Sequence, residues 1–75
     1  MFDGSLIRQH MEVVGSDGRH VGTVDRIEGR RIKLTKSDPA AGGQHHYISL
    51  AVVERITADA VRLTHTADET RKTWQ

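Results

Sequence analysis

Residues 13–25 carry the sequence VVGSDGRHVGTVD, which decides how this chain folds. Two runs rich in β-branched residues flank Asp17-Gly18, and an Asp-Gly pair between such runs is a strong signal for a β-hairpin. In the second run, residues 20–28, the alternation of apolar residues slips by one position near Gly22. A slip beside a glycine predicts a β-bulge or a sharp bend, which lets a small sheet curve.

Three further segments predict strands: residues 31–36, residues 47–53, and a last hairpin over residues 55–64. The first of these alternates cleanly, with Ile32 and Leu34 on one face and charged or polar residues on the other, as in a half-buried strand. The second is the most apolar part of the chain, and we expect it to end in a short turn or a helical turn around residues 51–54.

The last residues, 66–74, have a different pattern. Thr66 followed three residues later by Glu69 fits the capping box that begins helices. A helix this short is unstable in water on its own. We therefore predict a short C-terminal helix that Trp74 anchors on the rest of the fold.

The composition bounds the fold class. The chain has 75 residues, no cysteine and a formal net charge of +1. This length allows one domain, and the lack of cysteine excludes disulfides and thiolate metal sites. Short strands with glycine-rich turns favour an all-β fold, a small and partly open antiparallel barrel of five or six strands. The expected order is a lead-in over residues 1–10, the barrel over 11–64 and the helix over 66–74.

Two stretches resemble known families. Residues 13–25 look like the opening hairpin of PRC-barrel domains, which are SH3-like barrels. Residues 32–39 (IKLTKSDP) and 43–48 (GQHHYI) are similar to a small bacterial family of unknown function that is related to the PRC barrel. The resemblance covers residues 7–74. It implies a barrel that serves as a binding or assembly module, and it brings no catalytic residue.

No arrangement of residues indicates catalysis. Ser16, Ser37 and Ser49 lack the strained turn that presents a nucleophilic serine. The acidic residues are spread over turns and strand ends instead of being paired for acid-base work. The turn at residues 15–18 lacks the lysine and the following helix of a phosphate-binding loop. We therefore expect neither enzymatic activity nor a cofactor.

Positive charge gathers in a basic strip that consists of Arg30, Arg31, Lys33 and Lys36, with no acidic residue from 30 to 36. Such a strip suits phosphates or an acidic protein surface, although many charge runs are simply solvated strand faces. No aromatic residue interleaves with the strip, so base stacking is not supported. The near-neutral composition also excludes a dedicated nucleic-acid binder.

The break between strands at residues 37–46 holds a second candidate site, formed by Asp38, Gln44, His45 and His46. Neutral histidine is the commonest metal ligand. Adjacent residues on a strand face opposite sides, however. One ion would therefore need further ligands from His10, His20, His65 or an acid such as Asp38. The alternative is that one histidine packs against the barrel while the other faces solvent.

The leading prediction is a non-enzymatic interaction module that binds a protein partner or forms a homodimer through an exposed strand edge. Its expected contact surfaces are the basic strip and the 37–46 loop. Low-specificity nucleic-acid binding through the strip and a metal or ligand site at His45 and His46 stay open as alternatives. No apolar run reaches the roughly 18 residues of a membrane span, and we expect a cytoplasmic location.

Overall fold

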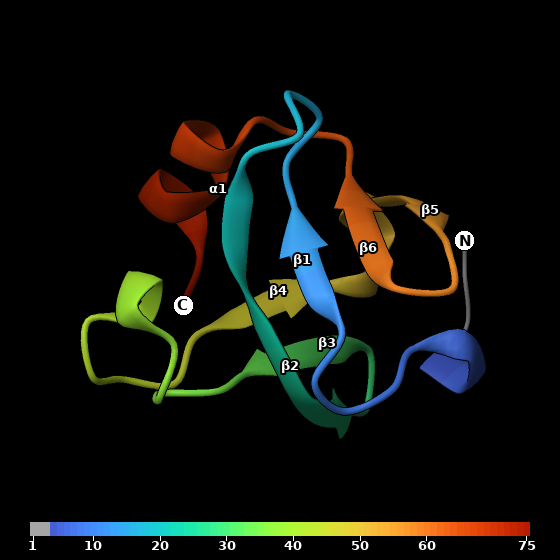
Figure 1. Cartoon of the computed structure of the whole chain (residues 1–75), viewed down its shortest axis with the longest axis horizontal. Helices are drawn as coiled ribbons and strands as arrows, with labels where there is room; N and C mark the ends of the chain where they lie inside the picture. The colour runs from blue at the N-terminus through green and yellow to red at the C-terminus, as the bar shows by residue number, and fades with distance from the viewer. Residues whose placement is uncertain (1–3) are drawn as a thin grey trace.

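Six short strands form one sheet, and a single short α-helix follows them (Figure 1). The computed structural model describes residues 4–75, so the first three residues of the expected lead-in lie outside the described part. The strands are β1 (Glu12–Val14), β2 (His20–Glu28), β3 (Arg31–Leu34), β4 (Tyr47–Ser49), β5 (Val53–Ile56) and β6 (Ala60–Leu63). Single turns of 3-10 helix are η1 (Gly4–Leu6), η2 (Pro39–Ala41) and η3 (Leu50–Val52), and the helix is α1 (Ala67–Thr73).

The order of strands in the sheet is β4-β3-β2-β1-β6-β5. All neighbours run antiparallel except β1 and β6, which are parallel. The expectation of purely antiparallel pairing is therefore wrong, because the sheet is mixed. The sheet does not close between β4 and β5, so it is not a closed barrel. Parallel neighbours need a long connection, and here residues 15–59 supply it. Alternation of apolar residues carries no information about strand direction, so the sequence could not reveal this pair.

Strand β2 joins the two halves of the sheet. Its first residues pair with β1 and its last residues pair with β3, so it bends as it crosses the molecule (Figure 1). The register shifts where Val13 and Val14 of β1 face Gly22 and His20, which confirms the predicted irregularity near Gly22. A Cβ at Gly22 would lie 2.9 Å from Leu34 Cδ1, so a larger residue there would have to displace the buried Leu34 side chain.

The core lies inside the bent sheet. Ile32 and Leu34 are fully buried, as the alternation of their strand predicts. The apolar strand that begins at residue 47 ends in a helical turn, as expected, but earlier than predicted, because the Ser49 hydroxyl accepts a hydrogen bond from the Ala51 N–H and starts η3. The chain thus turns before β5 begins. The other buried apolar residues of the core are Ile7, Met11, Val13, Val21, Val24, Ile48, Leu50, Val53, Val61, Leu63 and Ala67.

The predicted helix forms with its capping box intact. Thr66 Oγ1 accepts from the Glu69 N–H, and Glu69 Oε1 accepts from the Thr66 N–H. The helix begins against the β1–β2 turn, where Asp17 accepts from the Ala67 N–H and a Cβ at Gly15 would collide with that nitrogen. No helix within residues 4–75 is long and apolar enough to cross a membrane.

The chain end returns to β4. Trp74 packs against the core and stacks on His46, with ring centroids 3.9 Å apart and planes at 13°. Tyr47 and Gln75 exchange two backbone hydrogen bonds of 2.7 and 3.3 Å. The predicted anchoring role of Trp74 is confirmed, and the last residue covers the outer edge of β4.

Candidate functional site

The predicted basic strip falls on β3 and the turns beside it. Arg31 and Lys33 point to the same side of the strand, away from the core, as predicted. Arg30 lies in the preceding turn and Lys36 in the following one, and both are exposed. The strand therefore presents two of the four cations on one sheet face.

An acidic residue lies within this basic face. The register of β2 and β3 places Glu28 opposite Arg31, and Arg26 opposite Lys33. Glu28 Oε2 lies 2.6 Å from Arg26 Nη2 and 3.7 Å from Lys33 Nζ. The hydrogen bond from Arg26 lowers the pKa of Glu28 and keeps it ionised. The strip is thus partly neutralised by a neighbouring strand, which corrects the expectation of an uninterrupted cluster of positive charge.

An aromatic residue also lies there. Tyr47 of β4 is the register partner of Lys33, and the Arg31 guanidinium carbon lies 4.5 Å from the centre of the Tyr47 ring. This distance fits a cation–π contact. The prediction that no aromatic residue accompanies the strip holds along the sequence but is wrong in space. We call this surface the outer face, and it consists of Arg26, Glu28, Arg31, Lys33 and Tyr47.

A hollow of about 670 Å³ adjoins the outer face. It lies between the lead-in segment and strands β2 and β3, and polar groups from Asp25, Arg26 and Lys33 contribute to its wall. Ile7 and Ile27 supply apolar surface beside them. A smaller hollow of about 360 Å³ lies over β5 and β6, lined by three charged residues, Glu54, Arg55 and Arg62.

The two histidines of the 37–46 loop are not brought together. His45 Nδ1 lies 2.9 Å from the Leu34 carbonyl oxygen, whereas His46 Nε2 lies 3.0 Å from that of Ala41. Both rings are half-buried, so the expectation of one packed and one solvated histidine is wrong. Gln44 is exposed, and its backbone N–H reaches the Ala41 carbonyl at 3.3 Å. One nitrogen of each ring therefore has a backbone carbonyl as its hydrogen-bond partner, and neither ring forms a hydrogen bond with Asp38.

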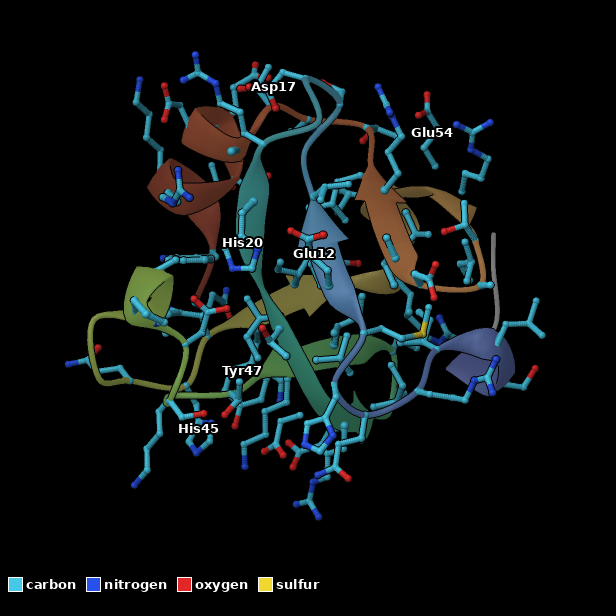
Figure 2. All side chains as sticks on the ribbon, viewed as in Figure 1. Glu12, Asp17, His20, His45, Tyr47 and Glu54 are labelled. Carbon is cyan, nitrogen blue, oxygen red and sulfur yellow. The ribbon has the colours of Figure 1, made fainter. Side chains whose placement is uncertain are left out.

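Asp38 instead contacts β2, in a cluster that the sequence did not indicate. His20 Nε2 lies 2.6 Å from Asp38 Oδ2, and His20 Nδ1 lies 2.8 Å from Glu12 Oε2. Thr23 Oγ1 donates to Asp38 Oδ2 at 2.7 Å, and the Ala40 N–H donates to Asp38 Oδ1 at 2.8 Å. We call Glu12, His20, Thr23 and Asp38 the His20 bridge. In Figure 2 the labelled side chains of His20 and Glu12 point toward one another from β2 and β1.

Charge and burial in the His20 bridge act against one another. Only 5% of the Asp38 side chain is exposed, against 40% for His20 and 50% for Glu12. Burial by itself raises the pKa of Asp38, but hydrogen bonds from Thr23, Ala40 and His20 lower it further than burial raises it. Burial likewise opposes the charged form of His20, but the bonds to Glu12 and Asp38 outweigh it and raise the pKa of the imidazole. The stable form of this pair is therefore an ionised Asp38 carboxylate next to a protonated His20 imidazole.

The two sites differ in how well the sequence could reveal them. The alternation of residues 47–53 places Tyr47 and Ser49 on the face opposite Ile48, but nothing along the chain pairs that face with Arg31. For the His20 bridge, Asp38 precedes a proline, a common signal for a turn, and no signal connects it to His20, eighteen positions earlier. Within residues 4–75, no group of three or more His, Cys, Asp or Glu side chains could hold a metal ion.

Comparison with known proteins adds a family. Residues 7–71 match the family described as "Uncharacterized protein conserved in bacteria (DUF2171)". This chain belongs to the DUF2171 family. The predicted resemblance to a small bacterial family of unknown function is confirmed at that level, and the matched DUF2171 region includes both the outer face and the His20 bridge. No curated protein matches the chain.

Proposed function

We propose that this DUF2171 protein is a non-enzymatic interaction module that binds a protein partner through the outer face. The observation that carries the proposal is the Arg31–Tyr47 pair, a guanidinium over an aromatic ring on the side of β3 and β4 away from the core. Arginine and tyrosine are enriched among the residues that dominate binding energy at protein interfaces. Both side chains already have a defined geometry, which lowers the entropic cost of ordering them on binding.

We also infer that this fold is related to the PRC barrel and has an SH3-like topology. Two features support this relation: the hairpin over residues 13–25 and the strong bend of β2 between its two partner strands. PRC barrels generally serve as binding or assembly modules. We infer a binding role from that relation, and the proposal places the protein in the cytoplasm of a bacterium.

Two observations favour binding over catalysis. Both ring nitrogens of His20 lie within hydrogen-bond distance of carboxylates, so that histidine is not poised to take a proton from a substrate. The hollow beside the outer face has walls of mixed polar and apolar character, its lining residues include no Ser, Thr or Cys, and the Lys33 amine in its wall lies 3.7 Å from Glu28.

The balance of charge favours a protein partner over nucleic acid. Each phosphate contact needs a free cation, whereas Arg26 and Lys33 both lie close to Glu28. A partner with mixed charges fits this face better than a uniformly negative strand, because complementary charges set specificity and register.

Self-association has a separate structural basis. Gln75 covers the outer edge of β4, whereas no strand within residues 4–75 pairs with the outer edge of β5. An unpaired edge is a template for a strand of a second copy. Light scattering coupled to gel filtration, over a range of protein concentrations, separates this outcome from binding of a different protein.

The test is capture of partners from the lysate of the bacterium by tagged protein, with and without nuclease. The tested variant combines Arg31→Ala and Tyr47→Ala, and the control is Arg19→Ala, whose side chain is 74% exposed and has only a 3.8 Å ion pair with Asp17. We expect one set of proteins that survives nuclease, that the control retains and that the double variant loses. Equal capture by the double variant would refute the outer face as the site. Capture that disappears with nuclease would favour the nucleic-acid alternative.

A further inference from the structure

Three histidines of this chain have defined hydrogen-bond partners around the 37–46 loop, and only one of them needs a positive charge. His45 and His46 each have one ring nitrogen against a carbonyl oxygen. A neutral imidazole has one N–H and satisfies such a bond fully. His20 has a carboxylate oxygen against each of its two nitrogens, at 2.8 and 2.6 Å. Only an imidazolium, with two N–H groups, donates to both.

We propose that His20 is a pH-sensitive latch, which ties η2 and β1 to β2 while its imidazole is protonated and loosens this connection when the imidazole loses a proton. The inference does not depend on the partner of the outer face. It concerns the contact between the start of the 37–46 loop and the sheet.

The two carboxylates respond differently to loss of the proton. Neutral His20 retains one N–H for two acceptors, and the lone pair of its other nitrogen then faces a carboxylate oxygen. Asp38 is almost completely buried and cannot turn to water, whereas half of the Glu12 side chain is exposed. The remaining N–H therefore stays with Asp38, and Glu12 leaves. The Asp38 bond becomes one to a neutral ring, which is weaker than a charge-assisted bond.

The other charged groups around His20 come from α1. Arg71 donates from Nη2 to the backbone carbonyl of His20, and its Nη1 lies 3.6 Å from Asp68 Oδ1. The pair of Arg71 with Asp68 offsets part of the positive charge that faces His20 from the helix. Glu12 from β1 and Asp38 from the loop thus remain the groups that set the charge of the ring.

Weakening of the His20–Asp38 bond loosens η2 through the backbone. Asp38 is the N-cap of that turn: its side chain accepts from the Ala40 N–H, and its carbonyl accepts from the Ala41 N–H at 2.9 Å. Exchange of these two amide protons with water therefore reports on the latch directly. His46 forms a hydrogen bond with the Ala41 carbonyl. Loosening of η2 therefore also affects a contact of the ring that stacks on Trp74.

The test is NMR spectroscopy of the free protein between about pH 5 and 9. We expect the His20 ring to titrate above the value of about 6.5 for an unperturbed histidine, and both Glu12→Gln and Asp38→Asn to lower that midpoint. Protection of the Ala40 and Ala41 amides, corrected for intrinsic exchange, should fall across the titration, because stability that depends on a raised pKa is lost as the pH rises through that pKa. Glu28→Gln on the outer face is the matched control, and we expect it to leave both readouts unchanged.

A midpoint at or below that of a free histidine would overturn the proposal. Amide protection that does not change with pH would also overturn it, as would an equal change in His20→Gln. If His20→Gln does not fold, Glu12→Gln decides, because it removes only the exposed carboxylate: an unchanged dependence of protection on pH would refute the latch, and a weakened one would support it. Partner capture by the outer face enters none of these readouts, so the two proposals fail separately.

Discussion

The outer face and the His20 bridge contain the same kinds of groups but differ in burial. On the outer face Glu28 contacts Arg26 and Lys33 within two adjacent strands, at exposures of 28% for Glu28 and 67% for Arg26. In the His20 bridge a carboxylate with 5% exposure joins a loop to β2. Water competes strongly for the exposed Arg26 and weakly for the buried Asp38. Similar ion pairs should therefore contribute little to stability on the outer face and much more in the bridge.

The largest expected effect is that of Asp38→Ala, which removes the acceptor of three hydrogen bonds and the N-cap of η2. We expect the free energy of unfolding to fall by about 2–4 kcal/mol, because buried donors lose their partner. Urea unfolding followed by circular dichroism measures it. Asp59→Ala, in the exposed β5–β6 turn, is the control. Equal losses in the two variants would erase the distinction between buried and exposed carboxylates.

A smaller loss is expected for Thr23→Val, which keeps the shape of the side chain and removes one hydrogen bond to Asp38. The unfolding free energy should fall by about 1 kcal/mol, the net value of one such bond. Thr35→Val is the matched control, because its hydroxyl contacts only the exposed Ser37. Thermal melts of both variants give the comparison, and a larger loss for Thr35→Val would contradict it.

A smaller loss of stability is expected when acid protonates Asp38 in the His20 bridge. The pKa of Asp38 in the folded protein is lowered, so its contribution is complete above the ordinary pKa of about 3.9 and is lost as the pH falls through the folded value. Stability of the native chain should therefore fall more steeply below pH 4 than that of Asp38→Ala. Urea midpoints at pH 3 and pH 6 measure this difference, and identical slopes would show that Asp38 does not titrate as described.

The smallest effect is expected on the outer face. Glu28→Gln removes the partner of Arg26 and Lys33, yet the unfolding free energy should change by less than about 0.5 kcal/mol, as is typical for exposed ion pairs. The same denaturant series measures it, at low and at high salt. A loss above about 1 kcal/mol would mean that the exposed network stabilises the sheet as the buried one does.

Local patterns in the sequence predicted most elements of the fold. The Asp17-Gly18 hairpin, the irregularity beside Gly22 and the capping box from Thr66 to Glu69 all depend on residues a few positions apart. Turn geometry and capping involve such neighbours alone, so they can be read along the chain. The fold class was correct as mostly β with a terminal helix, and the expectation that all strands pair antiparallel was wrong.

The sites depended on contacts between distant segments. Arg31 and Lys33 were correctly placed on one face, whereas Tyr47 and Glu28 joined them only through the register of three strands. Asp38 was named as a candidate beside His45, but the fold turned its side chain to His20 instead.

The sequence by itself determined the strands, the turns and the helix, because backbone preferences and apolar periodicity act over a few residues. The tertiary structure alone decided the parallel pair of β1 and β6 and the charge state that His20 needs. Both follow from which strand lies beside which, and that depends on burying a common core from all parts of the chain. The ionisation of His20 is set by two carboxylates that only the folded sheet and its loop bring within 3 Å of one ring.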